Sequence, residues 1–455
     1  MGTTQPSNPA QVRALSPCES LVDHLDGAYT CNFSCIASVR GELSEQKLQT
    51  ALSVVEQRHP LLRARIRRRW WGRKEFVAGQ GTPIPLKVVS GPPAAWREVA
   101  RASLEHRDWV DEGPRAELTW VRHSEERSTL VMCYQHAIAD GISSILVMRD
   151  LLDYVASGAR EAEPLPSPGI NAFAPSWWFT FRRTWSALLM QLVYFLRPWP
   201  TRLRTAWSAQ MHDRRVTLDS IQFTPEVSTQ LMLRARRDGV GLHGVLCGAI
   251  AQATARELGG SVQQRILHPV DLRRHLRELG SDAPPIGDAV GCYAAAVQTD
   301  HCINPEVSLE TVAQEVARSV RRQKASGEPL LTATHLGACL VAATRFMTRR
   351  LLRWFSENII FRGTFSLSNV GRVDDFGLRS QYGELEVEHV RLVSAGSVMH
   401  AMTAVASSFR RSIDLQVSSV QPFISRSVAE RVLADAELRL KAYAAGHTDD
   451  TDMAA

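Results

Sequence analysis

The sequence lacks several features that would each define a class of protein. No apolar run approaches the ~20 residues that cross a membrane, the first residues carry no secretory signal, and the GxSxG elbow of serine esterases is absent. Eight cysteines are scattered without a CxxC pair, so we expect reduced thiols and no metal site. These absences predict a cytoplasmic protein and disfavour an esterase.

The composition is that of a folded protein with a large core. Hydrophobic residues make up 44% and charged residues 22% of the 455 residues, which excludes fibrous and wholly disordered chains. Since a single core stops growing near ~250 to 300 residues, two lobes are expected. The net charge of +6 is spread along the chain rather than gathered in one patch, so we expect no nucleic-acid partner.

Helices and strands alternate along the chain. Apolar residues at helical spacing predict a helix over Glu45–His59, and runs rich in strand-forming residues lie on either side of it, at Cys31–Val39 and Thr129–Tyr134. This alternation indicates the α/β class. Later elements are predicted as helices over 142–154, 225–237 and 243–258, a strand over 413–417, and a last helix with a capping-box spacing at Ser427–Glu430.

Composition shifts divide the chain into four segments. A run with three prolines and no periodicity follows the helix predicted over 142–154, and strand-like sequence resumes near Arg215. We therefore expect a first lobe at 12–165, an apolar, aromatic connection at 166–214, a second lobe at 215–446 and a disordered tail at 447–455.

One short motif carries reactive chemistry. The strand that runs to Tyr134 leads into Gln135-His136-Ala137-Ile138-Ala139-Asp140-Gly141, which places His136 at the mouth of the strand. An imidazole with a pKa near ~6.5 accepts a proton from an alcohol, amine or thiol at neutral pH. We expect Asp140 to pair with an arginine and Gly141 to permit a tight turn. The spacing fits equally well a histidine that ends a strand before an Asp-Gly turn.

This segment resembles the HHxxxDG motif of the superfamily of peptide synthetase condensation domains, chloramphenicol acetyltransferase and the polyketide-associated acyltransferases of mycobacteria. Between about Leu15 and Ala444, five further segments resemble its motifs: Arg58–Arg63 (rHPxLR), Asp111–Pro114 (a shortened DxxxGP), Pro269–Arg273 (vdlR), Val290–Cys292 (vGN) and Ser366–Gly371, the SNxG of free-standing acyltransferases. Two features depart from the pattern. Gln135 replaces the first histidine, and the DFGWG segment of condensation domains is absent.

The resemblance implies a pseudo-dimer of two chloramphenicol-acetyltransferase-like lobes around a central channel. It implies transfer of an acyl group from a thioester, on coenzyme A or a phosphopantetheinyl carrier protein, with His136 as general base and with no bound cofactor or metal. A hydroxyl of a polyketide, lipid or other secondary metabolite is the favoured acceptor, because the SNxG branch mostly makes esters. An amine acceptor and a non-catalytic binding protein, which Gln135 would favour, stay open as alternatives.

Other polar residues receive roles beside His136. Arg273, in the matched strand, is expected to tie Asp140 to the second lobe, although Arg274 offers the same chemistry. Gln135 is expected to support the loop. Three residues of the SNxG segment are expected to bind substrate or donate to the oxyanion, unless they form only a polar turn: Ser366 for substrate, and Ser368 and Asn369 for the oxyanion.

Six further histidines are not expected to bind metal. They have no regular cysteine or carboxylate spacing around them, so structural or surface roles are expected for His59, His106, His243, His268, His335 and His400.

The segment 177–199 is the least family-like part of the chain. Its thirteen uncharged residues from Thr184 to Leu196 are too few to span a bilayer but enough for a helix in a membrane interface. One apolar face would comprise Trp185, Leu188, Leu189, Leu192, Phe195, Leu196 and Trp199. The alternative is a helix packed between the lobes. A second helix over 334–355 would form a basic rim for a carrier protein or membrane, or an ordinary surface helix.

Overall fold

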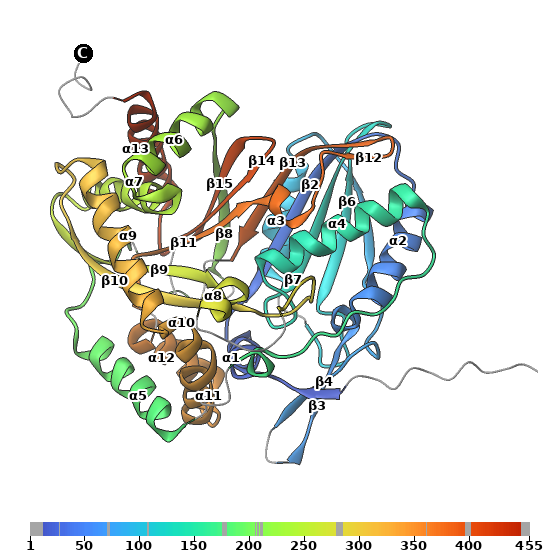
Figure 1. Cartoon of the computed structure of the whole chain (residues 1–455), viewed down its shortest axis with the longest axis horizontal. Helices are drawn as coiled ribbons and strands as arrows, with labels where there is room; N and C mark the ends of the chain where they lie inside the picture. Colours follow the sequence, from blue (N-terminus) through green and yellow to red (C-terminus); the bar gives the residue numbers. More distant parts are fainter. Residues whose placement is uncertain are drawn as a thin grey trace, which may run out of the picture.

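The fold comprises two six-stranded mixed sheets that lie side by side, one in each lobe (Figure 1). The computed structural model describes residues 12–446, apart from residues 27, 71–72, 107–108, 175–179, 205, 207–208, 210–212, 279–284, 361 and 396–401. The first sheet has the order β12 (Gln381–Tyr382), β13 (Leu385–Ser394), β2 (Asn32–Arg40), β7 (Arg127–Gln135), β6 (Ala116–Arg122) and β5 (Leu86–Ser90).

The second sheet has the order β10 (Ala294–Ile303), β9 (Val262–Asp271), β11 (Phe365–Arg372), β14 (Met402–Phe409), β15 (Ser412–Gln421) and β8 (Arg215–Gln222). A small third sheet consists of β1 (Val12–Ala14), β4 (Lys74–Val77) and β3 (Arg65–Arg68). The α/β class and the two-lobed architecture predicted from the sequence are confirmed.

Strands from late in the chain complete the first sheet. β13 pairs antiparallel with β2, from Glu386 opposite Arg40 to Ser394 opposite Phe33, so residues 381–394 belong by hydrogen bonding to the first sheet. The same strand also contacts β14 and β15 of the second sheet. The two lobes are therefore joined through β13. The predicted lobe boundaries at 165 and 215 stay a prediction, and they do not account for a strand from late in the chain in the first sheet.

Helices cover both faces of the first sheet and one face of the second. In the first lobe, α2 (Glu45–Arg58) and α4 (Gly141–Ser157) share a core with one face of the sheet, and α3 (Ala95–Glu105) packs on the other. In the second lobe, one face is covered by α6 (Pro225–Arg237), α7 (Gly241–Glu257), α9 (Leu309–Ala325) and α13 (Arg426–Ala445). The remaining helices are α1 (Pro17–Asp26), α5 (Phe181–Leu196), α8 (Leu272–Glu278), α10 (Glu328–Leu331), α11 (Gly337–Thr344) and α12 (Arg349–Phe355).

The predicted helix over Glu45–His59 is confirmed as α2, whose N-terminus is capped by Ser44 and whose end coincides with His59-Pro60. Two predictions are wrong in detail. The last helix is capped by Ser425, which accepts from the Val428 N–H at 3.4 Å, so no capping box starts at Ser427. The predicted helix over 334–355 is broken, because the Thr348 side chain caps a new helix, α12, after α11 has ended at Thr344.

Helix α5 exposes nearly all of the apolar face predicted for it. The seven residues of that face, from Trp185 to Trp199, have exposed fractions of 42–71%. The opposite side is anchored by Ala187 and by Tyr194, whose hydroxyl donates to Glu328 at 2.6 Å. Packing of the predicted face between the lobes is therefore wrong. The first residues of the predicted segment, 177–179, lie outside the described residues, and no described helix has the length and hydropathy needed to cross a bilayer.

Candidate active site

The motif loop is built by the end of one strand and the start of one helix. β7 ends at Gln135, and the His136 N–H donates to the Cys31 carbonyl of the neighbouring chain segment at 2.8 Å. The three residues between His136 and Asp140 are fully buried in the core of the first lobe. Asp140 then caps α4, accepting from the Ser143 N–H at 2.8 Å. The apolar middle of the motif thus anchors the loop in the core, while Asp140 is buried and hydrogen-bonded and His136 is half-buried.

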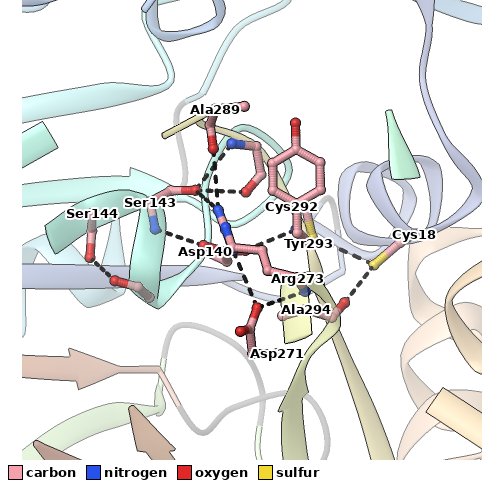
Figure 2. Close-up of polar contacts among 12 residues, drawn as sticks. Cys18, Asp140, Ser143, Ser144, Asp271, Arg273, Ala289, Cys292, Tyr293 and Ala294 are labelled. Atoms are coloured by element: carbon pink, nitrogen blue, oxygen red, sulfur yellow. Dashed lines mark hydrogen bonds and ion pairs between the residues drawn. The ribbon is translucent and has the colours of Figure 1, made fainter. Parts of the chain in front are cut away.

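Asp140 receives donors from both lobes (Figure 2). Its Oδ2 accepts from Arg273 Nη1 at 2.7 Å and from the Tyr293 N–H at 2.9 Å, both in the second lobe. Burial raises the pKa of Asp140, but the Arg273 charge and the surrounding donors outweigh it and hold the pKa below its usual value. Asp140 therefore stays ionised. Both of its carboxylate oxygens accept hydrogen bonds that hold the start of α4 against the second lobe.

Arg273, rather than Arg274, is the partner of Asp140. Its Nη2 donates to Ser143 Oγ at 2.9 Å, and its guanidinium lies 4.7 Å from the centre of the Tyr293 ring. Arg274 is exposed. The guanidinium fork thus grips two residues at the start of α4 at once, as the expected clamp between lobes requires.

The His136 ring is half-buried and lies against Phe33, with ring centres 4.8 Å apart. Its Nδ1 is buried and has no hydrogen-bond partner among the residues that the structure describes. Burial lowers the pKa of His136, but the nearby Cys292 thiol and Asp140 carboxylate raise it, and the pKa ends above its ordinary value. The raised pKa makes the ring a stronger base than a free imidazole.

Cys292 lies beside this ring and is paired with a second cysteine. The Cys292 thiol is 3.5 Å from that of Cys18, and all eight cysteines are free thiols, as expected (Figure 2). Hydrogen bonding to Cys18 and burial raise the pKa of Cys292 well above its usual value, so this thiol stays protonated near neutral pH. Cys292 occupies the last position of the segment that resembles the vGN turn, where it faces the predicted base.

Gln135 fills the position of the missing first histidine with a neutral, fully bonded side chain. It is buried, its amide donates to Asp26 at 2.7 Å, and its carbonyl accepts from Arg115. Asp26 in turn accepts from the Cys31 N–H at 3.3 Å, next to the carbonyl that holds His136. The supporting role predicted for Gln135 therefore has a concrete set of contacts.

A charged pocket of about 510 Å³ borders these contacts. Asp26 and Arg115, the partners of Gln135, line it together with Arg349 and Arg353 of α12. Five Arg or Lys side chains and three Asp side chains lie on its wall: Arg68, Lys74, Arg115, Arg349 and Arg353, with Asp23, Asp26 and Asp111. We call this the charged pocket. Two of its lining residues, Asp26 and Arg115, contact Gln135, which directly precedes His136 in the chain.

The other predicted residues are placed as follows. Gly141 is the first residue of α4, and its φ is not left-handed. A Cβ added there would meet only Leu392 and Val370, both at 3.6 Å. The prediction that this position needs a glycine for a tight turn is therefore wrong. The cap by Asp140 makes the turn instead. The SNxG segment lies within β11 at a β-bulge and is not a turn after a strand.

Within that segment, Asn369 accepts from the Gly371 N–H at 3.1 Å and so stabilises the bulge, while Ser366 is buried and Ser368 half-buried. Val370 of the same strand lies near Gly141, which brings the segment to the start of α4. The oxyanion and substrate roles of these residues stay predictions.

The histidines outside the motif divide into two groups. His59 is structural, as expected, because its Nε2 lies 2.8 Å from Asp150 in the core. His243 and His268, in contrast, are brought together with Cys247, a grouping that the irregular cysteine spacing did not predict. The one-turn spacing of His243 and Cys247 on a predicted helix was the signal for this cluster. His400 lies outside the described residues.

Two family models match the chain in succession. A condensation-domain model matches residues 3–174, and a model described as the C-terminus of phthiocerol/phthiodiolone dimycocerosyl transferase matches residues 212–432. Among curated proteins, one subunit of the plipastatin synthase of Bacillus subtilis is 24% identical over 256 residues, 55% of this chain and 7% of that protein. Another subunit of the same synthase is 24% identical over 356 residues, 77% of this chain and 13% of that protein. The chain thus spans a small part of these relatives.

Solved structures extend the likeness of fold to the whole chain. Trichothecene 15-O-acetyltransferase of Fusarium sporotrichioides has a TM-score of 0.72 at 13% identity, with 97% of both chains covered. The first condensation domain of the CDA synthetase has a TM-score of 0.71 at 15% identity, covering 98% of this chain and 99% of that one. Polyketide synthase associated protein 5 of Mycobacterium tuberculosis has a TM-score of 0.66 at 17% identity, covering 96% and 100%. With both family models and the shared architecture in agreement, this chain belongs to the superfamily of condensation-domain and chloramphenicol-acetyltransferase-like acyltransferases.

Proposed function

We propose that the protein moves an acyl group from a thioester to a hydroxyl, with His136 as general base, and so forms an ester in secondary metabolism. The observation that carries this proposal is the His136 ring. It is held at the end of β7, its pKa lies above the ordinary value, and its Nδ1 has no hydrogen-bond partner among the described residues. The condensation-domain family acts on carrier-bound thioesters without a cofactor, which supports a thioester donor here.

The reaction needs only one proton carrier. His136 takes the proton of the acceptor hydroxyl as the oxygen attacks the thioester carbonyl, and the tetrahedral intermediate then collapses with loss of the C–S bond. The histidinium returns its proton to the departing thiolate, so the ring ends neutral. Ser368, Asn369 or backbone N–H groups would stabilise the oxyanion, and Ser366 would contact substrate. Asp140, fully bonded to Arg273, Tyr293 and Ser143, contributes position and takes no proton.

The preference for a hydroxyl acceptor rests on the second half of the chain. The family model over residues 212–432 is named for a transferase of the phthiocerol class, and one structural relative is named as an O-acetyltransferase. A polyketide, lipid or other secondary-metabolite alcohol is the acceptor class that these names favour. Amide formation is the competing reaction, since the curated relatives are peptide synthetases.

The donor is assigned to the charged pocket. A phosphopantetheine arm carries phosphate whether it belongs to coenzyme A or to a carrier protein, and the pocket wall has an excess of two positive side chains over negative ones. Asp26 and Arg115 connect this wall to Gln135, next to His136. The thioester would therefore enter beside α12 and present its carbonyl to the histidine.

The exposed face of α5 is proposed to contact a membrane or a long acyl chain. Helix α5, whose Leu and Trp side chains are exposed, lies at the same end of the molecule as α11 and α12 (Figure 1). On α12 and just before it, Phe346, Leu351 and Trp354 are also exposed, among arginines. Apolar side chains flanked by cations are the pattern of interfacial binding. Under this proposal the protein is cytoplasmic and peripheral to the membrane.

Thiol release tests the chemistry. The purified protein would be incubated with a panel of acyl-CoA and acyl-carrier thioesters and with pooled alcohols and amines, and compared with a folded His136→Ala variant. Acceptor-dependent release that disappears in the variant is expected, with an ester as the product by mass spectrometry. An amide product would replace the ester assignment, and equal release by both proteins would remove His136 from the reaction. Silence across the panel would favour a binding protein.

Co-sedimentation with anionic vesicles at low salt tests the membrane contact. We expect binding that a double substitution of exposed residues, Leu189→Glu with Leu192→Glu, abolishes. The same substitutions at the exposed Leu438 and Leu233, far from α5 in the sequence, are the matched control. Absence of vesicle binding by the unmodified protein would end this part of the proposal.

A further inference from the structure

A second group of reactive side chains lies in the second lobe, apart from the motif loop. His243 stands in the first turn of α7, Cys247 follows one turn later on the same side of the helix, and His268 lies on β9. His243 Nε2 is 2.9 Å from His268 Nδ1, and the Cys247 sulfur is 3.6 Å and 3.8 Å from these two nitrogens. Three atoms that ligate metals thus face one another across the interface between helix and sheet.

The separations match those of ligands around one ion. Zinc bonds of ~2.0–2.1 Å to nitrogen and ~2.3 Å to sulfur, at tetrahedral angles, place ligand atoms roughly 3.3–3.6 Å apart. The two sulfur–nitrogen distances agree with this range within about 0.2 Å, and the two nitrogens need to separate by about 0.4 Å. Cys247 and His268 are buried, whereas His243 is half-buried, so the cluster is reached from its His243 side.

The hydrogen bonds behind His268 fix the tautomer that a metal requires. His268 Nε2 lies 2.7 Å from Thr299 Oγ1, which lies 2.7 Å from His301 Nε2. The other nitrogen of His301 is 3.0 Å from Glu315, a carboxylate at the surface. Because a carboxylate only accepts, His301 donates to it from Nδ1 and accepts the Thr299 hydroxyl proton at Nε2. Thr299 then accepts from His268 Nε2–H, so His268 Nδ1 carries no proton, and it is this nitrogen that faces His243 and Cys247.

We propose that His243, Cys247 and His268 form a binding site for Zn²⁺. Imidazole nitrogens and a thiolate are the ligands that zinc prefers, and a chain from carboxylate through histidine and hydroxyl to the ligating histidine is the outer support typical of such sites. Zinc displaces the Cys247 proton on binding, so the ion and thiolate together carry one net positive charge. The site joins α7 to β9 and leaves a fourth position for water on the His243 side.

The site is structural for the second lobe and does not take part in acyl transfer. Its ligands belong to α7 and β9 of the second lobe, whereas His136 follows β7 of the first lobe. Without metal, the same side chains are held by a His243–His268 hydrogen bond, which the His268 tautomer also permits. Metal binding therefore replaces the hydrogen bonds among these three side chains by three coordinate bonds.

Cobalt substitution of the full chain tests the proposal. After removal of metal with a chelator, Co²⁺ is added and the absorption spectrum recorded, because a thiolate ligand gives a charge-transfer band and tetrahedral geometry gives intense visible bands. One equivalent of Co²⁺ should bind with both signatures, and Zn²⁺ should displace it. Cys247→Ala should abolish the charge-transfer band, while the exposed Cys302→Ala, in the same lobe, should leave it unchanged.

A substitution that removes no ligand separates this site from adventitious binding. Thr299→Val keeps the shape of the side chain but breaks the chain to His268, and it should weaken Zn²⁺ binding about 10- to 100-fold in competition with a chromophoric chelator. His243→Asn, at the half-buried ligand, should remove tight binding in a protein that stays folded by circular dichroism. Absence of a thiolate band in the unmodified protein, or unchanged Zn²⁺ affinity in Thr299→Val and His243→Asn, would overturn the proposal.

Discussion

The two sides of the loop between β7 and α4 differ in how far their polar groups are satisfied. On the Asp140 side, each carboxylate oxygen accepts hydrogen bonds, and Arg273 and Tyr293 of the second lobe supply two of them. On the His136 side, the imidazole is half-buried, and its Nδ1 has no partner among the described residues. Both sides belong to the one short loop that links the strand to the helix.

This difference assigns separate tasks to the two sides. A buried carboxylate with three donors and a depressed pKa cannot exchange protons near neutral pH, so the Asp140 side serves as scaffold. A half-buried imidazole with a raised pKa can take up and release a proton near neutral pH. The comparison predicts that substitutions on one side change chemistry while those on the other change folding.

Removal of the imidazole should have the largest effect. His136→Ala should lower kcat/KM about 10²- to 10⁴-fold, the usual contribution of a general base, with little change in thermal unfolding. His123→Ala is the matched control, because both nitrogens of that half-buried ring already have partners, the Gly91 carbonyl at 3.0 Å and Thr129 Oγ1 at 2.9 Å. Comparable losses of activity in both variants would mean that His136 acts through structure alone.

Breaking the clamp should act on stability first. Arg273→Ala leaves Asp140 buried and ionised without its strongest donor, and it should lower the free energy of unfolding by about 3 to 5 kcal/mol. Arg274→Ala, one residue away and exposed, should leave the free energy of unfolding nearly unchanged. Urea denaturation measures both. If Arg273→Ala unfolds like the unmodified protein but loses activity, the clamp belongs to the chemistry and the division of the loop fails.

The pH dependence of kcat/KM should show that His136, and not Asp140, is the group that titrates during the reaction. A base must be neutral, and the pKa of His136 lies above the ordinary ~6.5, so kcat/KM should fall as the pH drops through a midpoint above that value. Cys292→Ala removes one group that raises this pKa and leaves burial, which lowers it, so the midpoint should move to lower pH. Cys35→Ala, buried in the first-lobe core, should not move it. An unchanged midpoint in Cys292→Ala would separate that thiol from the base.

The sequence predicted the parts of this site that depend on neighbours along the chain. The strand before His136, the helix after Gly141 and the core between them all follow from local apolar patterns. The pairing of Asp140 with Arg273 also follows from sequence, but only through the family resemblance, since spacing left Arg273 and Arg274 equal. The tight turn assigned to Gly141 failed because an N-cap makes the same change of direction without a left-handed φ.

Contacts between distant segments were not accessible in the same way. β13 joins β2 across more than 340 positions, and no periodicity in either strand shows the partner. The charged pocket combines α1, the end of β3 and α12, whose side chains look ordinary when read singly. His268 reaches His243 and Cys247 only because β9 packs beneath α7. Such sites are products of packing, and a single sequence shows at most a part of them, such as the one-turn spacing of His243 and Cys247.

The smallest predicted effect concerns binding of the thioester donor in the charged pocket, which the proposed function places on the His136 side of the loop. Arg349 stands on α12 with an exposed side chain at the pocket wall. If a phosphate-bearing donor enters here, Arg349→Glu should raise KM for the thioester about two- to fivefold, the equivalent of about 0.4 to 1 kcal/mol for an exposed charge, with kcat unchanged. The increase should shrink as salt screens the interaction. Arg345→Glu, four residues earlier and outside the pocket, should have no such effect. A change in kcat rather than KM, or equal effects of both substitutions, would place donor binding elsewhere and leave the pocket on the scaffold side of the comparison.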